Sequence, residues 1–180
     1  LYDEHVALGG RIVDFHGFEL PIWYSSISEE HVATRTGTGL FDVSHMGLFR
    51  FRGADVRAWL ETIATQRVTG VAPGRCAYTH FMDHEGHIID DMIFAVTSDN
   101  EILGVPNASM IAVMHQWFTE HLPKDGSVTL EDLSDTTAIL ALQGPGAKDV
   151  LSAVLGEAAH VGRFRWSPLY GAALGISGYI

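Results

Sequence analysis

The sequence has almost no cysteine: Cys76 is the only one among 180 residues. A single thiol excludes a disulfide bond within the chain and favours a reducing compartment. Long apolar runs are missing as well, and no stretch approaches the roughly 20 residues that a helix needs to cross a bilayer. We therefore expect no disulfide framework, no membrane-spanning segment and no membrane partner.

Positive charge is also scarce. The sequence carries 11 Lys and Arg residues against 22 Asp and Glu residues, which gives a formal net charge of −11. Because nucleic-acid phosphates are bound by a basic face, this balance argues against nucleic acid as a partner. The hydrophobic content of 47% is typical of a globular protein. The chain opens on Leu1 and stops in an apolar, Gly-rich segment, so we expect it to be a piece of a longer protein.

Two adjacent acids, Asp90 and Asp91, interrupt an otherwise apolar segment at residues 87–96 that reads as a strand. Strands disfavour Asp, and burying a carboxylate costs free energy unless it is paired. Because neighbouring side chains of a strand point to opposite faces, one acid can face a pocket while the other faces solvent or a helix end. A carboxylate held in this way is a candidate site residue, and a structural ion pair or turn partner is the alternative.

The order of the predicted elements indicates an α+β fold with antiparallel sheets and flanking helices. Alternating and helical spacings predict the order β-α-β-β-α-β, that of a ferredoxin-like unit, at residues 48–52, 54–64, 76–82, 87–96, 107–121 and 127–130. Asn107 is expected to cap the second helix, whose inner face carries Ile111, Met114, Trp117 and Phe118, and residues 101–105 are expected to extend the sheet. Outside this unit, Ser26 and Glu29 form a capping box for a helix that ends near Gly37 or Gly39. Further elements are expected at 11–18, 137–142, 147–154 and 172–176.

The hairpin turn before the two acids decides which of them faces a pocket. A three-residue loop puts Gly86 where a positive φ is required, and it pairs His80 with Asp90. Tyr78 then lies on the same face as Asp90, together with His80, Met82, Met92 and Phe94. A four-residue loop would place Tyr78 with Asp91 instead. We favour the shorter loop because of the glycine, so that Asp90 and Tyr78 share a face suited to a flat organic ligand.

The histidines of this hairpin raise the alternative of a metal site. The set consists of His80, His84 and His87 with Asp83, Glu85 and Asp90, and it matches no familiar zinc-binding pattern. We therefore predict a solvated, histidine-rich hairpin and no metal. A metal-binding α+β domain stays the competing hypothesis, which metal analysis of the purified protein would test.

Several short motifs follow one another in a fixed order along the chain. Among them are Gly39-Leu40-Phe41-Asp42-Val43-Ser44-His45-Met46, Gly86-His87-Ile88-Ile89-Asp90-Asp91, Val105-Pro106-Asn107-Ala108 and Leu142-Gln143-Gly144-Pro145. Together they resemble the N-terminal half of the glycine cleavage system T-protein, the aminomethyltransferase family. The resemblance implies a folate-binding three-domain T-protein fold, truncated here. The first domain would be discontinuous and incomplete, at 1–46 plus 135–180, and the second, ferredoxin-like, at 47–134. The C-terminal barrel domain would be absent from this chain.

The resemblance also implies a reaction. Family members are aminomethyltransferases that transfer a one-carbon unit from the aminomethyl-lipoyl H-protein to tetrahydrofolate and release ammonia. Asp90 would be the catalytic acid, which orients the folate and stabilises positive charge. The residues that bind tetrahydrofolate would be Tyr78, Asp90, Val105, Asn107, Met46 and Phe94. The lipoylated H-protein and the folate would be the partners, in the cytoplasm or, if the source is eukaryotic, in the mitochondrial matrix.

Departures from the family pattern leave other functions open. The final segment, Ile176 to Ile180, lacks the family's Arg-Thr step, and the residues that grip the pterin and the folate tail would lie beyond it. One alternative is a related tetrahydrofolate-dependent demethylase that acts on another methyl donor. Another is a non-enzymatic folate-binding member of the superfamily. The Ile-Asp-Asp motif favours aminomethyl transfer, and an intact Asp90 argues against a pure binding protein.

Overall fold

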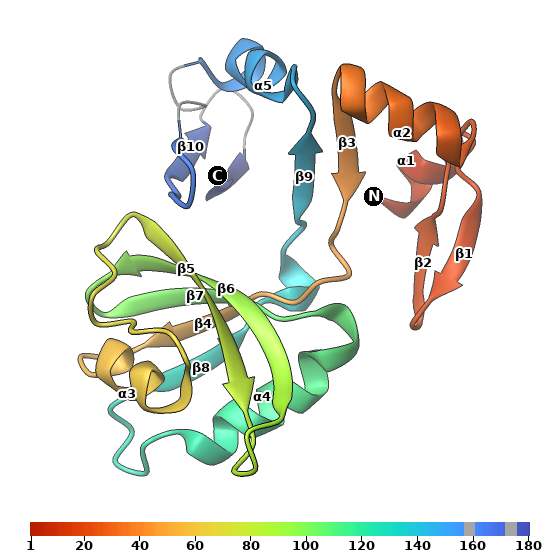
Figure 1. Cartoon of the computed structure of the whole chain (residues 1–180). Helices are drawn as coiled ribbons and strands as arrows, with labels where there is room; N and C mark the ends of the chain where they lie inside the picture. Colours follow the sequence, from red (N-terminus) through yellow and green to blue (C-terminus); the bar gives the residue numbers. More distant parts are fainter. Residues whose placement is uncertain (157–160, 172–175) are drawn as a thin grey trace. The chain divides into compact units, whose positions relative to one another are not determined.

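The computed structural model describes residues 1–156, 161–171 and 176–180, which form two compact units (Figure 1). Unit 1 comprises Leu1–His45 and Ala138–His160, and unit 2 comprises Met46–Thr137 and Val161–Ile180. Both units combine short helices with antiparallel strand pairs, so the predicted α+β class is confirmed. Within the described residues, no helix has the length and apolar character needed to span a membrane.

Unit 1 contains three helices and four short strands among its described residues. In chain order these are α1 (Tyr2–Ala7), β1 (Ile12–Phe15), β2 (Phe18–Pro21), α2 (Ile27–Thr36), β3 (Gly39–Asp42), β9 (Leu140–Gln143) and α5 (Ala147–Leu155). The single strand expected at 11–18 is a hairpin instead, because His16 and Gly17 both adopt a positive φ and reverse the chain. Strands β3 and β9, far apart in sequence, pair antiparallel.

The amino-terminal end of α2 follows the sequence pattern closely. The hydroxyl of Ser26 accepts a hydrogen bond from the backbone N–H of Glu29 at 3.2 Å, which is one half of the predicted capping box. Glu30, not Glu29, turns back, and its carboxylate accepts from the N–H groups of Tyr24 and Ser25. The helix ends at Thr36, immediately before Gly37, as predicted.

Unit 2 is built on a five-stranded antiparallel sheet in the order β5-β6-β7-β4-β8. The strands are β4 (Phe49–Arg52), β5 (Arg75–Met82), β6 (Ile88–Ser98), β7 (Glu101–Val105) and β8 (Thr129–Asp132). Figure 1 shows α3 (Val56–Ile63) and α4 (Ile111–His121) on one side of this sheet. Short 3₁₀ turns, η1 (Ala108–Met110) and η2 (Ser134–Thr136), complete the unit together with β10 (Pro168–Gly171) and β11 (Ile176–Tyr179).

The predicted β-α-β-β-α-β order is one strand short of the observed β-α-β-β-β-α-β. Strand β7 does not merely extend the sheet but lies inside it, between β6 and β4. Ile102, Leu103 and Gly104 are all buried, as expected for a strand with a neighbouring strand on each side. A Cβ atom at Gly104 would lie 2.7 Å from the ring of Phe94, so a glycine is needed for this close packing.

Aromatic side chains dominate the core between the sheet and its two helices. Phe49, Phe51, Phe81, Phe94 and Phe118 are all fully buried and contact one another edge to face or tilted. The predicted inner face of the second helix is confirmed, since Met114 and Phe118 are buried and Ile111 and Trp117 pack against the same cluster. The helix-covered face of the sheet is therefore apolar, and a charged group on it is exceptional.

The final segment differs from the predicted domain division, which assigned residues 135–180 to the first domain. Val161–Ile180 groups with unit 2, where the indole N–H of Trp166 donates to the Val96 carbonyl at 2.7 Å. The N–H of Cys76 also donates to the carbonyl of Phe164 at 2.9 Å. The strand expected at 172–176 lies outside the described residues except for its last position.

Candidate functional site

The hairpin that carries the two acids combines a correctly predicted turn with a wrongly predicted register. Gly86 has φ +88°, and the N–H of Asp83 donates to the carbonyl of His87 at 3.0 Å, as the three-residue loop requires. Met82 pairs with Ile88, but the next pair is Phe81 with Asp90, which leaves Ile89 as an extra residue in β6. This β-bulge shifts every later pair by one residue.

The bulge places Tyr78 and Asp90 on opposite faces of the sheet. His80 pairs with Asp91 rather than Asp90, so the predicted face shared by Tyr78, His80, Met82 and Asp90 does not form. Asp90 lies instead on the helix-covered face, where its strand neighbour is Met92 and its cross-strand partner is Phe81. The physical reason is that Phe81 and Met92 must both enter the aromatic core, and only the bulged register allows this.

Asp90 is a buried carboxylate with one oxygen satisfied. Its side chain is on the apolar face and the residue is 6% exposed. The amide Nδ2 of Asn107 donates to Asp90 Oδ1 at 2.7 Å. Asp90 Oδ2 is also buried, yet it has no hydrogen-bond partner among the residues that the structure describes. A buried polar atom without a hydrogen bond costs free energy. Asp90 Oδ2 is therefore an acceptor that a donor from outside the described residues, such as a ligand N–H group, can satisfy.

Asn107 has a different role from the one expected. It occupies the position before η1, but its side chain makes no capping bond to that turn. The amide points to the two acids: beyond its bond to Asp90, Nδ2 lies 3.2 Å from the carbonyl oxygen and 3.4 Å from Oδ1 of Asp91. The acceptors of both acids favour this orientation of the amide, because the opposite orientation would set its oxygen against theirs.

Asp91 faces the open side of the sheet, where it meets Tyr78. The phenol of Tyr78 donates to Asp91 Oδ2 at 2.6 Å, a short bond to a charged acceptor. This hydrogen bond raises the pKa of Tyr78, with smaller contributions from burial and from the charges of Asp91 and Asp90. The imidazole of His80 contacts the Tyr78 ring edge on at a centroid distance of 5.2 Å. Tyr78, His80 and Asp91 thus form a polar cluster on the open face of the sheet, opposite to the face that carries Asp90.

Val105 and Met46, which were also predicted to line the site, lie beside the segment that carries Asn107. Val105 is half-buried at the end of β7, pairs with Ile93, and leads through Pro106 directly to Asn107. Met46 is half-buried, and the following residue, Gly47, donates its N–H to the carbonyl of Pro106 at 3.2 Å. The backbone after Met46 therefore runs beside the segment that presents Asn107.

Phe94 does not belong to the site as the structure shows it. The side chain is 0% exposed and packs in the aromatic core against Phe51 and Phe81. A residue with no accessible surface cannot contact a ligand, so the prediction of Phe94 as a pocket residue is corrected to a core role. It shares the face of Asp90, but it lies four residues further along the strand and deeper under the helices.

The histidine-rich hairpin is exposed, and only some of its predicted members gather. Asp83, Glu85 and His87 bring their oxygen and nitrogen atoms within 4.8 Å of one another, whereas His80 and His84 are not part of this cluster. The N–H groups of His87 and Glu85 and the His87 imidazole all donate to Asp83 and lower its pKa. The cluster therefore serves as the hydrogen-bonded frame of the turn.

Sequence reasoning missed a partly buried polar network in unit 1. His5 Nδ1 lies 2.7 Å from the phenol oxygen of Tyr24, and His5 Nε2 lies 2.8 Å from Asp42 Oδ2. A neutral His5 in this position accepts the Tyr24 hydroxyl at Nδ1 and donates from Nε2 to the carboxylate. The three residues lie 19 and 37 positions apart, and a polar residue in a short amphipathic helix carries no local signal of such a partner.

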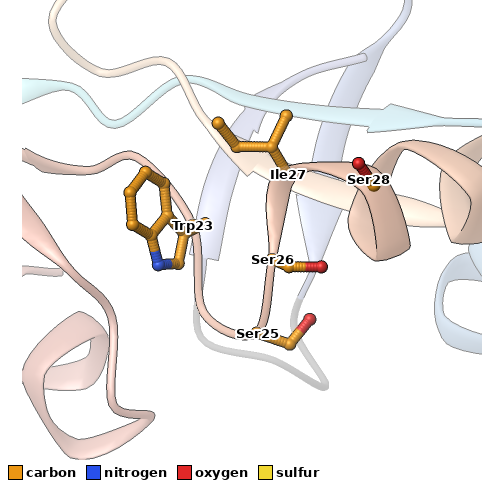
Figure 2. Close-up of a pocket in the computed structure, with 5 residues that line it drawn as sticks. All are labelled: Trp23, Ser25, Ser26, Ile27 and Ser28. Atoms are coloured by element: carbon orange, nitrogen blue, oxygen red, sulfur yellow. The ribbon is translucent and has the colours of Figure 1, made fainter.

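Unit 1 also has an open depression at the start of α2. Figure 2 shows the side chains of Trp23, Ser25, Ser26, Ile27 and Ser28 around it, and its volume is about 290 Å³. Two of its serines are engaged locally, since Ser26 caps the helix and the N–H of Ser25 donates to Glu30. It contains none of the residues that the sequence predicted as site residues.

The fold and this site define the class of the protein: it is an α+β protein whose five-stranded sheet has a buried carboxylate, held by an asparagine, on its helix-covered face. The particular family follows from comparison with known proteins. The family model described as the GCVT N-terminal domain matches residues 1–175, and the chain belongs to this family.

Similar proteins agree with this assignment. The chain is 43% identical over 152 residues to the aminomethyltransferase of Bacillus velezensis, and 38% identical over 151 residues to that of Thermotoga maritima. Each comparison covers 84% of this chain but 41% of the relative, so the chain spans about two fifths of the length of the relatives that it matches. Comparison of this structure with the crystal structure of the glycine cleavage system aminomethyltransferase T from Bartonella henselae gives a TM-score of 0.81. That likeness covers 99% of this chain and 51% of the other at 24% identity, and it supports the fold alone.

Proposed function

We propose that this protein is an aminomethyltransferase of the glycine cleavage system. It would transfer a one-carbon unit from the aminomethyl-lipoyl H-protein to tetrahydrofolate and release ammonia. The single observation that carries the proposal is the buried carboxylate of Asp90, whose Oδ2 has no partner among the described residues. Family membership and the aminomethyltransferase names of the relatives support the choice of reaction.

The residues around Asp90 fit a folate in chemical type. Reduced pterins carry several N–H groups, and a buried carboxylate oxygen without a partner is a matching acceptor. Asp90, Asn107 and Val105 would hold the ligand, with Tyr78 and Met46 as further candidates. When bound, tetrahydrofolate would supply the nitrogens that accept the one-carbon unit.

Asp90 can act because of its surroundings. With Oδ1 held by Asn107, the carboxylate is restricted in rotation and its free Oδ2 keeps one direction. Phe81 and Met92 flank it on the apolar face and exclude water. A fixed negative charge in a water-poor site stabilises positive charge that develops beside it more strongly than the same charge would in water.

The proposal is tested by turnover of the complete protein with aminomethylated H-protein and tetrahydrofolate. We expect both ammonia and methylenetetrahydrofolate to form. Two outcomes would point elsewhere. Turnover of a methylated sulfur or amine donor without use of the H-protein would identify a demethylase. Folate binding without turnover of either type of donor would identify a non-enzymatic binding protein.

A further inference from the structure

The second acid of the pair, Asp91, contacts the same amide that holds the first. One N–H of the Asn107 amide is taken by Asp90 Oδ1 at 2.7 Å. The other N–H is directed at Asp91, whose carbonyl oxygen lies 3.2 Å and whose Oδ1 lies 3.4 Å from Nδ2. Both donors of Asn107 are thus engaged by neighbouring residues of one strand. The amide links the helix-covered face of β6 to its open face.

The carboxylate of Asp91 is itself held from the open face. Tyr78 donates its hydroxyl to Asp91 Oδ2 at 2.6 Å, which leaves Oδ1 as the oxygen turned toward Asn107. The groups form a continuous chain, Tyr78 to Asp91 to Asn107 to Asp90, in which each link is a hydrogen bond or a close polar contact. Asp91 accepts from both of its neighbours and Asn107 donates to both acids, so a change at one member alters the contacts of the next.

From this chain we infer that Asp91, held by Tyr78, is a positioning residue for the reaction: it orients the Asn107 amide and thereby the Asp90 carboxylate. This inference rests on the proposed function of the Asp90 site. Without the charge of Asp91, the Asn107 amide keeps the Asp91 carbonyl oxygen at 3.2 Å but loses the charged acceptor at 3.4 Å that helps to select its orientation. Asp90 Oδ1 would then be satisfied for part of the time only, and the direction of Oδ2 would be less well defined.

A purely structural Asp91 would have different consequences. It would hold β5 to β6 through Tyr78, and its loss would lower stability without a specific effect on the rate. Asp83 offers a matched control in the same hairpin, because it bonds His87 and Glu85 but not Asn107. Asp83→Asn removes the charge of a hydrogen-bonded hairpin acid outside the chain of contacts.

The test is a kinetic cycle in the complete protein, with H-protein and tetrahydrofolate as substrates. We expect Asp91→Asn to lower kcat by about tenfold with little change in the KM for tetrahydrofolate, and Asp83→Asn to leave kcat unchanged. In an Asn107→Ala background, Asp91→Asn should have no further effect on kcat, because its influence passes through the amide. Equal effects of Asp91→Asn in both backgrounds, or an unchanged kcat in Asp91→Asn alone, would overturn the inference.

A second readout is independent of turnover. The ultraviolet titration of Tyr78, obtained as the difference between the wild type and Tyr78→Phe, should move to lower pH in Asp91→Asn, because the phenol loses its charged acceptor. An unmoved titration would show that the Tyr78–Asp91 contact is not made. A wild type that makes no methylenetetrahydrofolate would overturn the proposed function and the role of Asp91, while the titration still reports on the contact.

Discussion

Asn107 Nδ2 lies 2.7 Å from Asp90 Oδ1, and this is the one hydrogen bond that the described residues supply to the buried carboxylate. The two residues are 17 positions apart and meet because β6 and β7 are neighbours in the sheet. Asn107 follows the end of β7, so that its side chain reaches back to the start of β6.

Replacement of Asn107 by Ala should damage both stability and activity. The change leaves Asp90 buried without its donor, which costs about 1–3 kcal/mol of unfolding free energy. The rate of methylenetetrahydrofolate formation should fall by roughly the same free energy, about tenfold to a hundredfold. Urea unfolding and steady-state kinetics measure the two effects. Asn100→Ala is the control, because Asn100 is exposed in the β6–β7 turn. A variant with wild-type kinetics would contradict the role of the pair.

The two acids should differ in importance. Asp90→Asn keeps the shape of the side chain and can still accept the Asn107 bond, so folate binding should survive. The loss of the charge should reduce kcat by about a hundredfold or more. Asp91→Asn should be milder, since Asp91 acts only through Asn107. Equilibrium folate binding together with single-turnover rates separates the two effects, and the opposite ranking would make Asp91 the acid that faces the substrate.

Phe94 should prove to be a core residue in solution. Phe94→Ala removes a ring that is fully buried against Phe51 and Phe81, and it should lower the free energy of unfolding by about 3–5 kcal/mol. Its strand neighbour Ile93 is 45% exposed on the other face, so Ile93→Ala should cost much less. Chemical denaturation of both variants measures the difference. A small loss in Phe94→Ala together with a raised KM for tetrahydrofolate would restore Phe94 to the ligand site.

Gly104→Ala tests how tightly β7 is packed inside the sheet. The added Cβ would lie 2.7 Å from Phe94 Cε1 and 3.3 Å from the Phe51 ring, so one of two buried rings would have to move. Overpacking of this kind typically costs about 1–3 kcal/mol. Gly178→Ala is the control, because no atom lies within 4 Å of the added Cβ. Equal thermal stability of the two variants would show that the core around β7 is looser than described.

The network around His5 should make stability depend on pH. Burial acts to raise the pKa of Asp42, but hydrogen bonds from Ser44 and His5 outweigh it, so the pKa of this carboxyl lies below its ordinary value. A lowered pKa means that the unfolded chain binds the proton more readily. The stabilisation is complete above the ordinary Asp pKa of about 4 and is lost as the pH falls through the lower value of the folded protein.

This dependence can be measured by urea unfolding between about pH 6 and pH 2.5. We expect the wild type to lose more stability than Asp42→Asn across the acid end of this range, because the variant has no carboxylate to protonate. Asp125 also has a lowered pKa, from hydrogen bonds donated by Ser127, but it lies on an exposed turn, where solvent screens its charge. Asp125→Asn should therefore remove a smaller part of the pH dependence than Asp42→Asn. A parallel loss of stability in the wild type and Asp42→Asn would exclude Asp42 as a source of the pH dependence.

Local features of this chain were determined by the sequence itself. The start of α2 at Ser26, its end before Gly37 and the buried stripe of Met114 and Phe118 in α4 follow from capping residues and helical spacing. The turn at Gly86 follows from the need for a positive φ. Each of these features depends on residues within a few positions of one another. Membership of the family likewise rests on motifs that can be read in order along the chain.

Only the tertiary structure decided which face each acid occupies. The bulge at Ile89 is a response to the core, because Phe81 and Met92 must both point at the helices, and a one-residue shift is the only way to reconcile this with the three-residue turn. The Asn107 side chain donates to Asp90, 17 residues away in sequence, and does not cap η1, because the buried Asp90 carboxylate needs a hydrogen-bond donor. The face of each acid and the partner of Asn107 depend on long-range packing and on the cost of an unpaired buried charge. Neither can be predicted from residues that are close together in the sequence.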